Sequence, residues 1–100
     1  VDIRKDSPTY GNYTSVLLSE ENKKQLWVPP GFAHGILALE DHTITLYKCS
    51  NIYNKYGESG LDPFDEKLNI NWGIQKQNVT LSLKDSDAKS FLEYKKDPKF

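Results

Sequence analysis

The sequence of 100 residues contains one cysteine and lacks long hydrophobic runs. Because a single cysteine has no partner within the chain, no disulfide framework supports this small domain, and we interpret Cys49 as a small buried apolar side chain rather than a nucleophile. No apolar run approaches the roughly 20 residues that a membrane-spanning helix needs. The first residues also lack the basic region and apolar stretch of a signal peptide. These absences predict a cytoplasmic protein without membrane contact.

The sequence also lacks an excess of charge of either sign. Its 13 Lys and Arg residues against 14 Asp and Glu residues give a net charge of -1. This balance argues against nucleic acid as a partner, because no basic surplus offsets the phosphates. Hydrophobic residues make up only 37% of the chain. We expect a single domain, residues 1–100, with a thin core and a partner subunit that supplements it.

Short runs of β-branched and aliphatic residues, separated by turn residues, occupy the first seventy positions. This pattern is typical of an all-β sandwich or barrel. Residues 34–39 and 43–50 are predicted to form a hairpin around an acidic turn. Within the second strand, alternation places Ile44 and Leu46 on an aliphatic face and Tyr47 on a face that carries hydroxyl groups. The hydroxyl face is a candidate lining for a cavity.

An irregular stretch and a helix are predicted for the rest of the chain. Residues 51–66 show no clear period, and loops this long in a compact domain are often functional. Asp85 follows Ser82 at the spacing of a capping box, and residues 85–96 are compatible with a helix. The sequence therefore predicts one short C-terminal helix.

The segment Pro29-Pro30-Gly31-Phe32-Ala33-His34 has a P-x-G-x-x-H arrangement. The prolines remove consecutive N–H donors and the glycine permits a tight reversal, so the turn delivers His34 to the start of a strand, where we expect it to face a barrel mouth. The pattern resembles the second motif of the cupin superfamily, whose histidine is often a metal ligand. A metal site needs three or four ligands, and His42 in its charged turn is a poor second one. A polar active-site role for His34 is favoured over a structural one and over metal binding.

Longer blocks run through the sequence in a fixed order. They are VDIRKDSPTYG at 1–11, ENKKQLWVP at 21–29, GFAHG at 31–35, YKC at 47–49, the aromatic Tyr53, GLDPFD at 60–65, LNINW at 68–72 and LKD at 83–85. In content and order these blocks resemble the dTDP-4-dehydrorhamnose 3,5-epimerase family. The resemblance covers nearly the whole chain.

The resemblance implies proton chemistry on a dTDP-linked 4-keto-6-deoxy sugar, in rhamnose or related deoxysugar biosynthesis, with no metal or organic cofactor. A ketone at carbon 4 acidifies the hydrogens on carbons 3 and 5, so a base removes one and an acid returns a proton to the opposite face. The family's acid, a tyrosine, matches Tyr47. The aspartate that orients the family's base histidine matches Asp85. His34 and Tyr53 match residues of the substrate pocket.

The resemblance also implies a fold, the cupin-type double-stranded β-helix or jelly-roll barrel, ending in a short helix. Residues 1–100 would be the C-terminal two-thirds of that barrel. The family's N-terminal strands and its R-G-L-H-type segment with the base histidine have no match here, so we expect little epimerase activity from these residues alone. A partial barrel exposes unpaired edges, so a homodimer or higher oligomer is expected.

Two alternatives stay open from the sequence. The first is a non-catalytic sugar-nucleotide-binding or structural module that acts within an oligomer. Tight binding of the sugar nucleotide without proton exchange would favour it. The second is a cupin metal enzyme, which requires bound metal in stoichiometric amount.

Overall fold

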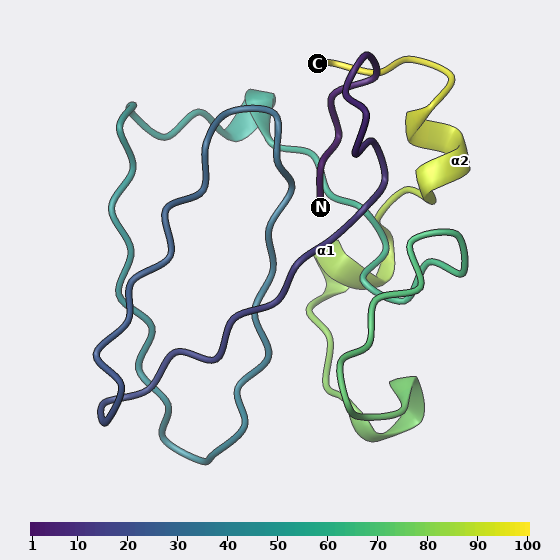
Figure 1. The fold of residues 1–100 in the computed structure, drawn as a ribbon. Helices are drawn as coiled ribbons and strands as arrows, with labels where there is room; N and C mark the ends of the chain where they lie inside the picture. Colours follow the sequence, from purple (N-terminus) through teal and green to yellow (C-terminus); the bar gives the residue numbers. More distant parts are fainter.

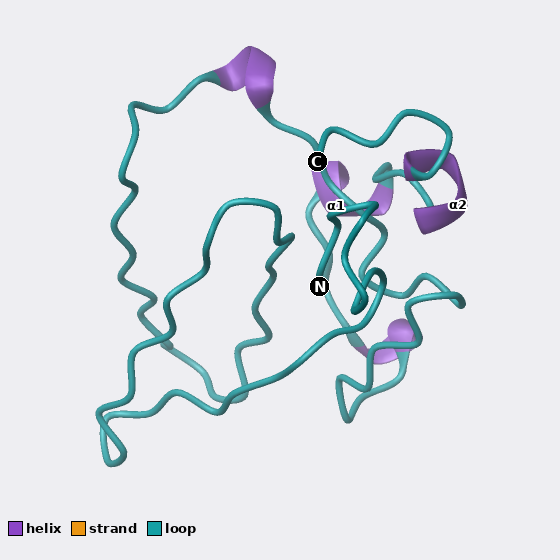
Figure 2. Cartoon of the chain, turned by 45° about the horizontal axis from the view of Figure 1, so that its top comes forward, coloured by secondary structure: helices purple, strands orange, loops and turns teal.

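A computed structural model describes residues 1–100, which divide into a packed part and an open meander (Figure 1). The packed part consists of residues 1–13 and 60–100, together with residues 31–33, which pair with the N-terminal segment, and the rest of residues 14–59 forms the meander. Four short helices are present, namely the 3-10 helices η1 (Lys55–Gly57) and η2 (Lys76–Asn78) and the α-helices α1 (Leu83–Ser86) and α2 (Phe91–Tyr94). No strand longer than an isolated bridge is present, as the loop colour of Figure 2 shows. No helix is long and apolar enough to cross a membrane.

The N-terminal segment is paired on both of its edges. On one edge, the Asp2 amide donates to the Asn12 carbonyl over 2.9 Å. On the other, the Ile3 amide donates to the Gly31 carbonyl over 3.0 Å, and Asp2 and Phe32 form an antiparallel bridge. Gly31 has a φ of +84°, a conformation that side chains with a Cβ rarely adopt. The turn predicted at this glycine is therefore confirmed.

Asp65 joins the loop after residue 60 to helix α2. One carboxylate oxygen, Oδ1, accepts from the amides of Lys67 at 2.8 Å and Leu68 at 3.0 Å. The other, Oδ2, accepts from the amide of Phe91 at 2.8 Å. Phe91 is the first residue of α2, where the backbone N–H has no partner within the helix. One buried carboxylate thus satisfies three backbone donors.

The core is as thin as the composition predicts. Its buried hydrophobic side chains are Leu68, Phe91 and Tyr94, with Val1, Ile3, Tyr10, Leu61 and Ile70 packed around them. The rings of Phe91 and Tyr94 stack with centroids 6.3 Å apart. The Tyr94 hydroxyl donates to the Ile3 carbonyl over 3.0 Å, so it ties α2 to the N-terminal segment.

The predicted single C-terminal helix is wrong in its extent. Ser82 caps α1 as the sequence indicates, because its hydroxyl accepts from the Asp85 amide. The chain then leaves the helix at residues 87–89, where Lys89 forms a parallel bridge with Leu61. A second cap at Ser90 starts α2, with a full capping box to Glu93. Competition from the bridge splits one predicted helix into two single turns.

Backbone pairing is missing from the predicted hairpin. The turn between residues 39 and 43 is present, and the Thr43 hydroxyl donates to the Glu40 carbonyl over 2.7 Å. Residues 34–39 and 43–50 are extended, but no backbone hydrogen bond joins them. In Figure 1, these two extended segments meet at the turn at the bottom of the view and run apart above it. Cys49, predicted to be buried, is exposed for the same reason: nothing packs over its strand.

Asp65 provides a test of what holds the packed part together. Replacing it with alanine leaves three backbone donors without their acceptor, so we expect Asp65→Ala to lower the free energy of unfolding by about 3 kcal/mol. Asp65→Asn keeps one acceptor oxygen and should cost less. Urea unfolding followed by circular dichroism measures both. Asp6→Asn, at an exposed aspartate without a hydrogen-bond partner, is the control, and an equal effect at Asp6 would contradict the assignment.

The same residue predicts a pH dependence. Burial raises the pKa of the Asp65 carboxyl, but its three backbone hydrogen bonds outweigh this and bring the pKa below its usual value. A lowered pKa gives stability that is present above about pH 4 and is lost as the pH falls through the folded-state pKa. Asp65→Asn should therefore flatten the loss of stability in acid. Asp2, whose pKa is also lowered by its bond to Arg4, leaves a residual slope.

Candidate functional site

Tyr47 and Tyr53 lie in the part of the meander that follows the turn between residues 39 and 43. Both side chains are exposed, 82% for Tyr47 and 71% for Tyr53, so neither faces an enclosed cavity. The chain after Tyr53 turns sharply into η1, because the Asn54 side chain caps that helix by accepting from the Tyr56 amide over 3.0 Å. This cap brings the loop back toward the packed part of the molecule.

An ion pair connects that loop to α1. The Lys84 Nζ atom lies 2.5 Å from the Glu58 Oε2 atom. The Glu58 carboxylate also interacts with the Tyr53 hydroxyl. The bond to Lys84 lowers the pKa of Glu58, and the bond to Glu58 raises the pKa of Lys84. Glu58 and Lys84, which are 26 positions apart in the sequence, therefore form an ion pair beside Tyr53.

Tyr53 is held in its protonated form by this contact. Its hydrogen bond to Glu58 raises the pKa of the Tyr53 hydroxyl above the usual value, since ionisation would place two negative charges together. Tyr47 acts on Tyr53 in the same direction, while the charge of Lys84 opposes it. The Tyr53 hydroxyl is consequently a hydrogen-bond donor at neutral pH.

Asp85 follows Lys84 in the first turn of α1. Its Oδ2 atom accepts from the Ser82 hydroxyl over 2.7 Å, and its amide donates back to that hydroxyl over 3.1 Å. The carboxylate contributes to the raised pKa of Lys84. Its Oδ1 atom has no hydrogen-bond partner. Asp85 thus retains one oxygen that can accept from a further group.

We call Tyr47, Tyr53, Glu58, Lys84 and Asp85 the tyrosine–lysine cluster. It groups three of the four residues that the sequence singles out with two that sequence reasoning missed, Glu58 and Lys84. The ion pair joins Glu58 to Lys84, Asp85 follows Lys84 in α1, and Tyr47 forms no hydrogen bond to the other members. Lys84 stands in the matched LKD block, and Glu58 in the long loop marked as functional. The sequence could have indicated this pair, because the acidic Glu58 lies close to Tyr53 and the basic Lys84 lies next to Asp85.

His34 stands apart from this cluster. It directly follows the paired residues 31–33, and its side chain is exposed and forms no hydrogen bond. Next to it, a Cβ on Gly35 would lie 3.5 Å from the Trp72 ring. No sheet forms around His34 in these residues, so the expectation that its imidazole faces a barrel mouth stays a prediction.

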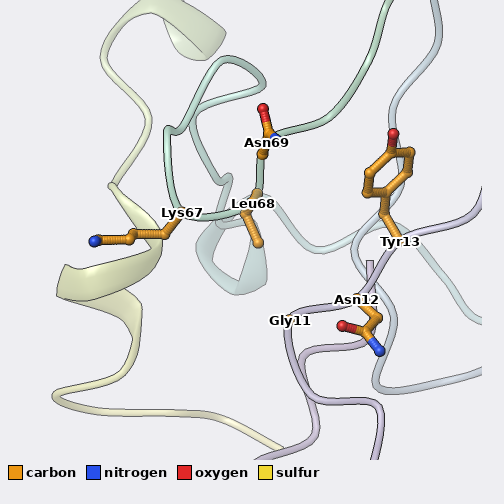
Figure 3. Close-up of a pocket in the computed structure, with 6 residues that line it drawn as sticks. All are labelled: Gly11, Asn12, Tyr13, Lys67, Leu68 and Asn69. Carbon is orange, nitrogen blue, oxygen red and sulfur yellow. The ribbon is translucent and has the colours of Figure 1, made fainter.

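A hollow of about 420 Å³ lies elsewhere on the molecule (Figure 3). Its lining residues come from two segments, Gly11, Asn12 and Tyr13 from the first and Lys67, Leu68 and Asn69 from the second. The Tyr13 hydroxyl accepts from the Asn71 amide over 3.0 Å, which holds the two segments together. None of the sequence-predicted site residues lines it. No group of three or more His, Cys, Asp and Glu side chains is placed to hold a metal ion.

The cluster supplies two kinds of chemistry. Tyrosine hydroxyls donate protons or hydrogen bonds to an oxygen that gains negative charge, and the Lys84 ammonium favours that charge. The carboxylates of Glu58 and Asp85 accept hydrogen bonds from hydroxyl or imidazole groups. These groups can serve the acid side of an acid–base reaction on a carbonyl compound.

Comparisons with known proteins find one matching family and several relatives. The family model described as dTDP-4-dehydrorhamnose 3,5-epimerase matches residues 1–93. The chain is similar to the dTDP-4-dehydrorhamnose 3,5-epimerase of Shigella flexneri, at 47% identity over 93% of this chain and 50% of the relative. Similar enzymes occur in Methanothermobacter thermautotrophicus, at 42% identity over 93% and 51%, and in Salmonella typhimurium, at 47% over 88% and 48%. The chain spans about half the length of these relatives, and no solved structure matches it.

The contacts of Tyr53 predict opposite effects of two substitutions. Glu58→Gln removes the negative charge beside the hydroxyl and should lower the pKa of Tyr53 toward about 10. Lys84→Gln removes a positive charge that favours tyrosinate and should raise that pKa further. Ultraviolet titration of each variant, with the Tyr53→Phe spectrum subtracted, measures the value. Lys24→Gln in the distant turn is the control, and shifts of the same sign in both test variants would contradict the arrangement.

Proposed function

Because the chain belongs to the dTDP-4-dehydrorhamnose 3,5-epimerase family, we propose that residues 1–100 form the acid side of an active site that epimerises carbons 3 and 5 of dTDP-4-keto-6-deoxyglucose. The tyrosine–lysine cluster is the observation that carries this proposal. Its Glu58–Lys84 ion pair stands beside Asp85 in the sequence and interacts with Tyr53, which supports a shared role for the residues that match the family's second tyrosine and its aspartate. A cytoplasmic location and a nucleotide-sugar substrate accord with this function.

Each residue of the cluster has a role in the proposed reaction. Tyr47 returns a proton to the sugar carbon from one face, and Tyr53 contacts the substrate through a hydroxyl that stays protonated. Asp85 orients the base histidine, for which its Oδ1 atom is available while Ser82 occupies Oδ2. An aspartate that accepts the imidazole N–H fixes the tautomer and stabilises the charged ring after proton abstraction. His34 lines the pocket, and the chemistry requires no metal or organic cofactor.

No residue of the cluster fills the role of the base. Neither histidine of these 100 residues, His34 or His42, contacts Asp85. This observation favours a second candidate function, in which the chain binds the sugar nucleotide without exchanging its protons. Isotope exchange separates the two functions.

We propose that the meander becomes part of a jelly-roll barrel when further strands cover it. Large apolar side chains crowd this segment and are exposed, among them Trp27, Ile36, Leu39, Ile44, Leu46 and Ile52. Between residues 14 and 53, the single internal backbone hydrogen bond runs from Lys23 to Ser19. Apolar faces and unpaired edges of this extent are stabilised by pairing with another chain segment. A homodimer or higher oligomer supplies such cover.

Deuterium exchange tests the proposed reaction. In deuterated water, we expect residues 1–100 to bind dTDP-4-keto-6-deoxyglucose but to exchange its carbon-3 and carbon-5 hydrogens only at the background rate. Adding the half of the Shigella flexneri relative that this chain does not match should restore exchange. Tyr47→Phe should then lower the rate by about 10²-fold or more, the usual contribution of a general acid. Proton NMR of the sugar follows the reaction.

Tyr56→Phe is the matched control, since this tyrosine in η1 is exposed and outside the cluster. Its exchange rate should equal that of the unchanged chain. Failure of the sugar nucleotide to bind, or an unchanged rate in Tyr47→Phe, would overturn the proposal. Binding without exchange in the complemented protein would instead establish the second candidate function.

Association through the meander has its own test. Leu46 is 90% exposed, and alternation along residues 43–50 predicts that Thr45 lies on the opposite face. We expect the chain to sediment as a dimer or larger species, and Leu46→Glu to weaken association about tenfold or more, because a carboxylate would be buried without a partner. Thr45→Glu is the control. A monomer at all concentrations, or equal effects of both variants, would contradict the proposal.

A further inference from the structure

The N-terminal residues form a network around one buried carboxylate, which we call the N-terminal clasp (Asp2, Arg4, Ser7 and Thr9). Asp2 is only 2% exposed. Its Oδ1 atom accepts from the Arg4 amide at 3.0 Å and from Arg4 Nε at 2.9 Å, and its Oδ2 atom accepts from Arg4 Nη2 at 2.9 Å. The hydroxyls of Ser7 and Thr9 also donate to Oδ2. This paired geometry fixes the plane of the guanidinium group.

The fixed guanidinium covers the turn that leads to His34. Its Cζ atom lies 4.6 Å from the centroid of the Phe32 ring. The stem of Arg4 fills the space beside Gly31, where an added Cβ would come within 2.5 Å of the Arg4 Cγ atom. The clasp therefore packs on two consecutive residues of the turn, one through its charged end and one through its carbon chain.

The backbone of the turn is held by the same segment. The Gly31 carbonyl accepts from the Ile3 amide at 3.0 Å, and the Ala33 amide donates to the Val1 carbonyl at 2.9 Å. These bonds end immediately before His34, whose own side chain has no hydrogen-bond partner. The position of the His34 backbone is thus set by residues 31–33, while the imidazole itself forms no hydrogen bond.

We propose that Asp2 and Arg4 are positioning residues for His34. Through the Arg4 side chain they fix Gly31 and Phe32, and through these the backbone position from which the imidazole reaches its ligand. The identity of that ligand as a dTDP-linked sugar rests on the proposed function, whereas the placement of the ring does not. The role requires arginine, because lysine keeps the charge but offers neither two parallel donors to Asp2 nor a planar group to cover Phe32.

NMR of the two histidine rings tests the proposal directly. In Arg4→Lys we expect the Cε1–H signal of His34 to shift and broaden, while that of His42 stays in place. His42 is an internal reference, since it lies in the exposed turn of the meander. Substitution of each histidine by glutamine assigns the signals. A folded Arg4→Lys protein with an unchanged His34 signal, or with equal shifts at both histidines, overturns the proposal.

A matched control and a milder variant complete the experiment. Lys99→Gln removes another ion pair between residues two apart, Lys99 with Asp97 at 2.5 Å, and should move neither histidine signal. Thr9→Val removes one donor to Asp2 at nearly constant volume and should shift His34 in the same direction by less. If Arg4→Lys unfolds the protein, Thr9→Val decides, and an unchanged His34 signal in that variant overturns the proposal.

Ligand binding separates this inference from the proposed function. Titration with dTDP-4-keto-6-deoxyglucose should move the His34 signal of the unchanged chain, and Arg4→Lys should weaken the Kd by roughly tenfold, as expected for one misoriented hydrogen bond. A ligand that does not bind the unchanged chain counts against the proposed function alone, because the effect of Arg4→Lys on the free His34 ring is still measured. An Arg4→Lys protein that binds with unaltered Kd counts against the positioning role.

Discussion

The packed part of this protein depends on one buried carboxylate, that of Asp65. Its two oxygens bind the amides that begin a turn at Leu68 and the helix at Phe91, which are two of the three buried hydrophobic residues. Packing of these side chains sets the place of Tyr94, whose hydroxyl reaches the Ile3 carbonyl. The N-terminal segment in turn holds the turn before His34. The Asp65 carboxylate is thereby linked through a thin core to His34, a residue of the proposed substrate pocket.

The meander follows a different rule, because its stabilising partners are not within these residues. An extended chain with alternating apolar side chains gains stability only when its amides are paired and one face is covered. Here the turns form, as at Thr43, but the strands between them neither pair nor pack. Turn geometry is encoded by a few neighbouring residues. A sheet requires contacts between segments that are distant in sequence, which explains why the turns are present without the strands.

The same distinction explains how much the sequence predicts. Local signals are reliable: the cap at Ser82 and the glycine turn at Gly31 both form where the residue types indicate. The division of the last helix at Lys89 and the exposure of Cys49 depend on what lies across from each residue, which no local pattern contains. At the site, Tyr47, Tyr53 and Asp85 come from the family resemblance. The Glu58–Lys84 pair links a loop to α1 and is visible only in the folded chain.

The Glu58–Lys84 ion pair also relates the covering of the meander to the chemistry of the proposed site. In its present setting the Lys84 side chain is largely exposed, and an ion pair in contact with water contributes little to stability because solvent screens it. Covering the meander would remove water from Tyr47, Tyr53 and the Glu58–Lys84 pair together. In the lower dielectric that results, attraction between the charges strengthens, and the hydrogen bond that keeps Tyr53 protonated strengthens with it. In the proposed assembly, burial of the apolar face and strengthening of the Glu58–Lys84 pair would therefore occur together.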